Sequence, residues 1–176
     1  MTSTDAGELS AMAAQRCNVP GSMGTRNWFR LSAMLPGGLD VVQVELWPDR
    51  GAFRGGAVRP GTYQLAGEDL DYATCGVCLR ALGDRGQPTQ REYFAVAGTV
   101  EVSAVASTEG APFVATVREA SFAEVDADHS EVEGGCTLDL SSAKISGSLV
   151  LMGGSGGGAG GGGGAGGAGC PATVGE

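Results

Sequence analysis

Basic residues are scarce in this sequence, which has 11 Lys and Arg against 20 Asp and Glu and a formal net charge of −9. A nucleic-acid-binding protein needs a basic face to neutralise phosphates, and a polybasic membrane-surface protein needs clustered cations. The few arginines are scattered along the chain instead. No apolar run reaches the roughly 18–20 residues that span a bilayer. The sequence therefore predicts neither nucleic acid as a partner nor a membrane-spanning segment.

Side chains typical of catalysis are sparse as well. His129 is the only histidine, so a serine or cysteine hydrolase would have to use it as the base. It lies in a polar, acidic stretch, and no serine occupies the strand-turn-helix elbow of such enzymes. No pattern singles out a pair of carboxylates for glycoside hydrolysis. We therefore expect a protein that is not an enzyme and that holds no cofactor, apart from the calcium site considered below.

Helical periodicity is nearly absent, and strand periodicity takes its place. The only candidate helix covers Ala6 to Cys17. From Trp28 onward, apolar and polar residues alternate in eight short segments that turns rich in Gly, Pro and Asp separate. This spacing predicts an all-β protein, an antiparallel β-sandwich of the jelly-roll or Greek-key kind.

Two details of the alternation concern register. Phe94, Val96 and Val100 are expected to share one face of a long strand. In the following strand the apolar positions shift by one residue between Val117 and Ala120. Such a slip inverts the faces, so a β-bulge near residues 118–119 is expected to keep both sets in the core.

Composition divides the chain into three parts. Residues 1–24 form a polar N-terminal segment, residues 25–152 the β-sandwich domain, and residues 153–176 a glycine-rich tail. The tail has nothing to bury and loses much backbone entropy when it is ordered, which is typical of a flexible linker. The alternative is a polyglycine packing element that becomes ordered against a neighbouring chain in a polymer, since glycine lets backbones approach closely.

Five cysteines suggest an oxidising compartment, and all five are disulfide candidates: Cys17, Cys75, Cys78, Cys136 and Cys170. Cys75 and Cys78 form a C-x-x-C motif within a segment that alternates like a strand. Residues i and i+3 of a straight strand point to opposite faces, so either Gly76 turns the backbone and the two bond to each other, or each pairs elsewhere, with Cys136 and Cys17. We expect both to be oxidised. A zinc site or a redox pair are the alternatives, although neither a second ligand pair nor a helix after the first cysteine is evident.

Two further sets of residues are candidates for ligand binding. Asp126, Asp128 and Glu131 are oxygen donors in one loop and are candidates for Ca²⁺, although the loop lacks the spacing and glycine of an EF-hand. Trp28 and Trp47 lie opposite the main apolar face of their strands. Partly exposed there, they could form a carbohydrate-binding surface by stacking, or else a second small core or an oligomer contact.

Three segments carry a resemblance to a known group. PGTYQL at residues 60–65, YATCGVC at 72–78 and YFAVAGTV at 93–100 resemble uncharacterised secreted or lipoprotein-type β proteins of myxobacteria. The likeness covers roughly residues 28–140. It implies export and a β fold, and it implies no activity and no catalytic residue.

The location follows from the cysteines and from this resemblance. Residues 1–24 have no charged segment followed by an apolar core, so they are not a signal peptide; the chain is either cytosolic or has lost a signal. The cysteine content favours export. The sequence therefore predicts a non-enzymatic structural or adhesion module, extracellular or at the cell surface, whose partner is itself or another surface protein. The alternatives are a Ca²⁺- or carbohydrate-binding domain, or a thiol-redox or metal protein using Cys75 and Cys78.

Overall fold

The computed structural model describes residues 4–21 and 24–152, and within them it contains strands and two short 3₁₀ helices. The strands are β1 (Thr4–Ser10), β2 (Ala13–Gly21), β3 (Gly24–Met34), β4 (Val41–Leu46), β5 (Gly61–Gln64), β6 (Val77–Gly83), β7 (Arg91–Ala104), β8 (Pro112–Val125), β9 (Thr137–Ser148) and β10 (Val150–Leu151). The 3₁₀ helices are η1 (Gly51–Phe53) and η2 (Gly67–Leu70). The all-β prediction is confirmed. In these residues no helix is long and apolar enough to cross a membrane.

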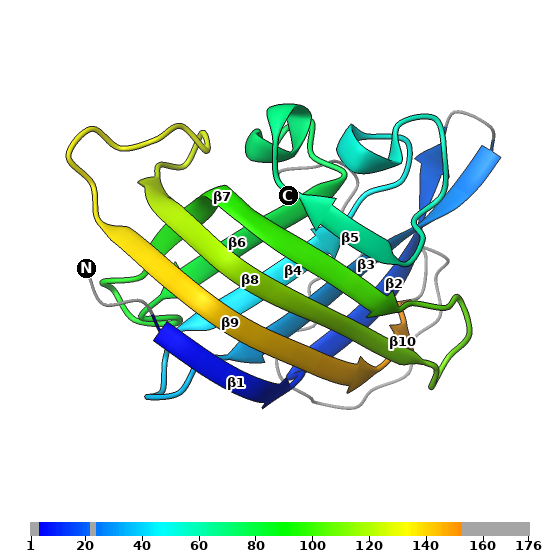
Figure 1. Ribbon diagram of the computed structural model, residues 1–176, viewed down its shortest axis with the longest axis horizontal. Helices are drawn as coiled ribbons and strands as arrows, with labels where there is room; N and C mark the ends of the chain where they lie inside the picture. The colour runs from blue at the N-terminus through cyan, green and yellow to red at the C-terminus, as the bar shows by residue number, and fades with distance from the viewer. Residues whose placement is uncertain (1–3, 22–23, 153–176) are drawn as a thin grey trace.

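All ten strands belong to one mixed sheet, with the order β1-β9-β8-β7-β6-β4-β3-β2-β10 and β5 paired to β7. Most neighbours are antiparallel, but β1 runs parallel to β9, and β10 runs parallel to β2. The sheet curls into a half-barrel (Figure 1). The turn between β1 and β2 connects the two sides of this curled sheet. The Ala11 N–H donates to Ser146 O in β9 at 2.8 Å, and the Met12 N–H donates to Ser32 O in β3 at 2.9 Å.

The curl replaces the two packed sheets that the sequence predicted. A strand with alternating residues buries one face both in a sandwich of two sheets and in a single curled sheet. The alternation of apolar and polar residues therefore does not distinguish these two folds. Strands β7 and β8 are each 14 residues long, and this length lets one sheet wrap around its own core. The expected antiparallel pairing holds except at the two parallel pairs.

The candidate helix over residues 6–17 does not form. That segment forms β1 and β2, which pair with β9 and β3, so part of the N-terminal segment 1–24 belongs to the sheet. The spacing of Leu9 and Met12 fits one helix face, but Leu9 packs on the core whereas Met12 is 44% exposed. Strand pairing with two neighbours outweighs a weak helical preference.

The concave side of the sheet encloses the main core, called here the interior core. Its members from β3, β4, β8 and β9 belong to the segments in which the sequence alternates apolar and polar residues. The loop between β4 and β6 closes one end with Phe53 and Leu65. The fully buried side chains of the interior core include Leu31, Val44, Leu46, Leu79, Phe113, Val117, Phe122, Leu140 and Ile145.

The bulge expected in β8 is confirmed, and β7 contains the matching irregularity. Val117 and Ala120 are both buried, Glu119 between them has a φ of 48°, and the register against β7 shifts on both sides of Ala97. A Cβ on Gly98 would lie 2.9 Å from the Ala120 Cα, so glycine permits this close approach.

The shift within β7 also changes which of its residues face inward. It corrects the prediction that Phe94, Val96 and Val100 share one face. Val100 lies in the interior core, Val96 is 47% exposed, and Phe94 lies on the convex side.

A second cluster, called here the outer core, lies on the convex side of the sheet. The segment that carries η2 and the following turn folds over this side, where its side chains meet those of β2, β3, β6 and β7. The buried members of the outer core are Cys17, Val19, Trp28, Trp47, Tyr72, Cys75, Cys78 and Phe94.

Candidate functional site

The C-x-x-C motif lies in the outer core as a bonded pair. Cys75 precedes β6, Cys78 is its second residue, and their Cα atoms are 5.4 Å apart. Both residues are 0% exposed. The chain therefore uses the tight Cys75–Cys78 loop, the first of the two arrangements that the sequence allowed.

The other cysteines differ in state. Cys136 is an exposed free thiol, so the alternative bond from Cys75 to Cys136 is not formed. Cys17 is buried in the outer core and is not free. Cys170 and the predicted glycine-rich tail lie outside the described residues.

One buried carboxylate organises the loop that carries the disulfide. Asp69 in η2 is 5% exposed, and its Oδ1 accepts backbone N–H groups from Gly76 at 2.8 Å, Val77 at 3.1 Å and Ala52 at 3.3 Å. The backbone around Gly76 lies so close to Arg50 O that a side chain at residue 76 would collide with it. Asp69 thus ties η1, η2 and the start of β6 together, which is a structural task for a charged group.

The two tryptophans are buried, which corrects the predicted binding surface. Trp28 is 1% exposed and Trp47 is 4% exposed, and their ring centroids lie 5.6 Å apart in the outer core. They lie in a second small core, which was one of the alternatives that the sequence offered. Alternation placed them on the correct face but could not show that the loop after η2 covers it.

A buried charge pair supports these rings. Glu45 is 0% exposed, and its Oε1 accepts from Arg30 Nε at 3.0 Å while its Oε2 accepts from Trp47 Nε1 at 3.2 Å. The Arg30 guanidinium also lies 4.8 Å from the Trp28 ring centroid. Each carboxylate oxygen has a donor, as a buried charge requires.

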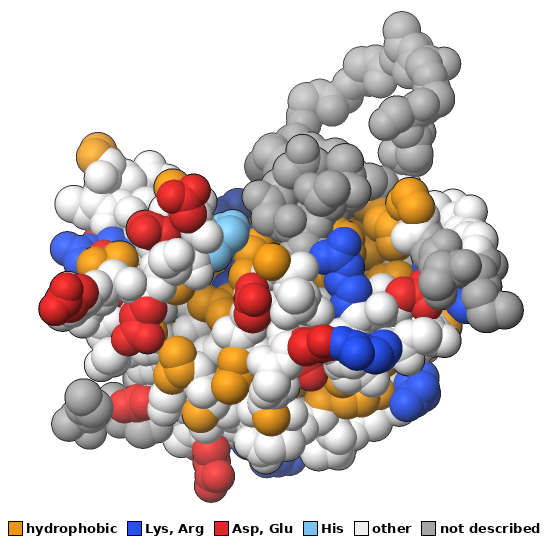
Figure 2. Space-filling view, turned by 90° about the horizontal axis from the view of Figure 1, so that it is seen from above, with side chains coloured by type: hydrophobic (Ala, Val, Ile, Leu, Met, Phe, Trp, Pro, Cys, Tyr) orange, Lys and Arg blue, Asp and Glu red, His pale blue; other side chains and the backbone are white. Residues whose placement is uncertain are grey.

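A second polar group borders the outer core. Arg80 donates to the Tyr72 hydroxyl at 2.7 Å and pairs with Glu92 at 3.1 Å. Burial, and after it the charge of Glu45, raise the pKa of the Tyr72 phenol, although Arg80 acts in the opposite direction. His129 packs against Tyr72 with ring centroids 4.4 Å apart, and Figure 2 shows this histidine in pale blue on the face seen from above. The only histidine is thus beside an aromatic ring.

The acidic loop proposed for calcium uses its first carboxylate internally. Asp126 Oδ1 accepts the N–H groups of Asp128 at 2.9 Å and Ser130 at 3.0 Å, and Glu131 forms a β-bridge with Val125. Residues 4–21 and 24–152 contain no group of three or more His, Cys, Asp or Glu side chains placed to hold a metal ion. Calcium binding stays a prediction that calorimetric titration can test.

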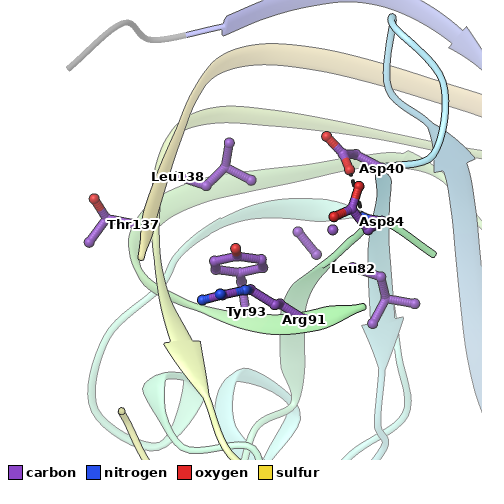
Figure 3. Close-up of a pocket in the computed structure, with 9 residues that line it drawn as sticks. Asp40, Leu82, Asp84, Arg91, Tyr93, Thr137 and Leu138 are labelled. Atoms are coloured by element: carbon purple, nitrogen blue, oxygen red, sulfur yellow. Dashed lines mark hydrogen bonds between the residues drawn. The ribbon is translucent and has the colours of Figure 1, made fainter. Parts of the chain in front are cut away.

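A cavity of about 270 Å³ opens where the interior core reaches one end of the half-barrel (Figure 3). Its apolar part is formed by Ala81, Tyr93 and Leu138, which belong to the interior core or pack against it. Asp40 and Asp84 lie on one side of the Tyr93 ring (Figure 3). The Asp84 N–H donates to Asp40 Oδ1 at 3.0 Å, which places the two carboxyl groups close together. We call this the end cavity.

Arg91 forms another wall of the end cavity, and its charge is already paired. Its Nη1 contacts both carboxylate oxygens of Glu124, at 3.0 and 2.8 Å, and lies 3.6 Å from the Cys136 Sγ. The Glu124 carboxylate also accepts the Cys136 N–H at 2.8 Å. This backbone hydrogen bond and the contacts with Arg91 lower the pKa of Glu124, despite a partial opposing effect of burial. The free thiol therefore lies beside an ion pair.

Sequence reasoning missed the end cavity altogether. Its residues come from β6, β7 and β9, from Asp40 just before β4 and from Asp84 just after β6, and only the curl of the sheet brings these places together. One local signal was present: Gly83 is paired near Tyr93, and a Cβ there would lie 3.2 Å from the tyrosine ring. A glycine opposite an aromatic residue can mark a place where a ring lies across a strand.

Comparisons with known proteins add no relative: no family model, no curated protein and no solved structure matches this chain. The resemblance to exported myxobacterial proteins stays a prediction.

Proposed function

We propose that the protein is an exported, non-enzymatic module of the cell surface or extracellular space, with a structural or adhesive role. The observation that carries this proposal is the burial of the Cys75–Cys78 disulfide, both residues being 0% exposed. Disulfides persist in oxidising compartments, and a buried one adds stability to a small β domain.

The same burial speaks against the thiol-redox alternative. Thiol–disulfide exchange requires a thiolate to reach one of the sulfur atoms, and catalytic C-x-x-C pairs are accessible for this reason. Here the pair is packed among Trp28, Trp47 and Tyr72. Asp69 holds the loop before Cys78 through backbone hydrogen bonds. This arrangement suits a permanent crosslink.

Exposed apolar side chains support the adhesive part of the proposal. Met34 and Leu39 are each 45% exposed and line a shallow hollow together with Arg85. Met12, 44% exposed, lies beside them, because Arg85 Nη1 is 3.6 Å from its sulfur. Grouped apolar side chains of this kind are common where one protein contacts another.

The test is to locate the protein in its source cells with thiols trapped before lysis. We expect protease added outside intact cells to degrade it, and we expect Cys75 and Cys78 to resist the trapping reagent. A protein found inside the cells with both thiols trapped would overturn the proposal. Activity in an insulin-reduction assay would favour the redox alternative instead.

The adhesive role needs its own measurement. Beads coated with the protein should self-associate or bind source cells, and Met34→Glu with Leu39→Glu should reduce this binding. A matched control is Val96→Glu, because Val96 is similarly exposed at 47% but lies on β7 outside the hollow. Equal loss in both variants would contradict the assigned surface.

A further inference from the structure

We propose that the end cavity binds a neutral sugar, one hexose-sized unit at a time. Its volume of about 270 Å³ is near the lower limit of the roughly 300–1,000 Å³ typical of pockets for drug-sized ligands. Such a space suits a single sugar ring, either free or at the end of a glycan. The inference is independent of export, and it moves the carbohydrate hypothesis from the buried tryptophans to a different place.

The polar groups of the cavity favour a ligand that carries hydroxyl groups. Asp40 uses Oδ1 to accept from the Asp84 N–H, and Asp84 uses Oδ2 to accept from the Thr89 hydroxyl at 3.0 Å. Each carboxylate thereby keeps one oxygen that can accept from a ligand. Arg91 is bonded to Glu124 through Nη1, which leaves its other N–H groups to donate. A hydroxyl both donates and accepts, so a polyol satisfies both walls.

The charged groups of the cavity favour a neutral ligand. An anion would meet the carboxylates of Asp40 and Asp84, while the charge of Arg91 is already balanced by Glu124. A cation offers no acceptor for the remaining N–H groups of Arg91. A neutral polyol avoids the repulsion from the carboxylates, can accept from Arg91, and still gains charge-assisted hydrogen bonds, which are roughly twice as strong as neutral ones.

The ring of Tyr93 favours a ligand that has an apolar face. In Figure 3 this ring lies below the Leu138 side chain, with Asp40 and Asp84 off to one side. The C–H face of a pyranose can pack on an aromatic ring while the hydroxyls at its edge reach the polar walls. A linear polyol lacks such a face and is expected to bind more weakly.

The experiment is saturation-transfer NMR on the folded protein with glucose, galactose, mannose and N-acetylglucosamine, each tested separately. Choline and acetate serve as a cationic and an anionic comparison. At least one sugar should receive saturation, mainly on the protons of one ring face, with a dissociation constant of about millimolar order, as expected for so small a ligand. Failure of all four sugars, or binding of choline or acetate alone, would overturn the proposal.

Variants then locate the binding. Tyr93→Leu should weaken it roughly tenfold through the lost ring, whereas Tyr93→Phe should retain most of it. Asp40→Asn with Asp84→Asn should weaken it roughly fivefold by removing charge assistance. Asparagine tolerates the positive φ of 51° at residue 84, so this pair tests the site even if Tyr93→Leu does not fold. Asp128→Asn, in another hollow, is the control. Loss in Asp128→Asn, or none in the aspartate pair, would place the sugar elsewhere.

Discussion

The interior core and the outer core lie on opposite sides of the same sheet, and they are stabilised differently. The interior core consists of apolar side chains that meet because the sheet curls. The outer core is smaller and combines aromatic rings with a disulfide, and it is bordered by the buried Glu45–Arg30 pair. Alternating strands supply most of the first, with Phe53 and Leu65 added by the segment between β4 and β6, whereas the second depends on a loop held in place by Asp69.

The interior core should show the largest single effect. Phe113 is 0% exposed and meets the Phe29 ring edge-on at a centroid distance of 5.9 Å. Phe113→Ala should lower the free energy of unfolding by about 4 kcal/mol, because it removes a buried ring and leaves a cavity. Urea denaturation measures this change. A loss below about 1 kcal/mol would mean that the interior is not closely packed.

The buried charge of the outer core comes next. Glu45→Ala should lower the free energy of unfolding by about 3 kcal/mol, because it leaves Arg30 without its partner inside the protein. Glu101→Gln is the matched control: Glu101 pairs with Arg118 at 3.6 Å, and its side chain is 41% exposed. An exposed pair contributes about 0–1 kcal/mol. Similar losses in both variants would contradict the special role of Glu45.

The disulfide should contribute less than either of these side chains. Replacing Cys75 and Cys78 together by alanine should lower the free energy of unfolding by about 2 kcal/mol, since the loop closed by the bond is short. The interior core should stay folded, which circular dichroism can verify. Loss of all β structure in this variant would show that the two cores do not fold independently of the bond.

The smallest effect concerns alkaline pH. The pKa of Tyr72 is raised above its usual value of 10.0 in the folded protein, chiefly by burial and then by Glu45. Its contribution to stability is therefore complete below pH 10 and is lost as the pH rises through the folded value. Tyr72→Phe should reduce the fall in melting temperature above pH 10. An identical fall in both proteins would contradict the burial of this phenol.

Much of the interior core could be predicted from the sequence, because period-two alternation depends only on neighbours along the strand. Phe29, Leu31 and Val44 are examples. The bulge near Glu119 was also predictable, since the shift in apolar positions is visible in the sequence. The matching shift in β7 was not, because Gly98 is needed only where β8 approaches it closely.

The candidate sites were less predictable, for a physical reason. The pairing of Cys75 with Cys78 was one of two arrangements, and the choice depends on a turn that the Asp69 carboxylate holds through hydrogen bonds that no residue pattern reveals. The burial of Trp28 depends on the same loop. The end cavity depends on how strand ends meet after the sheet curls, which no local pattern records.

The most direct test of the account is whether the outer core keeps its disulfide closed in the folded protein. Protein prepared without reductant is alkylated while folded and then digested. The mass of the peptide that contains both Cys75 and Cys78 is measured by mass spectrometry. We predict an unalkylated peptide whose mass is lower by two hydrogens than that of its reduced form. We also predict that a mild reductant opens the disulfide only after urea has unfolded the protein. Alkylation of both cysteines in the folded, unreduced protein would contradict the account.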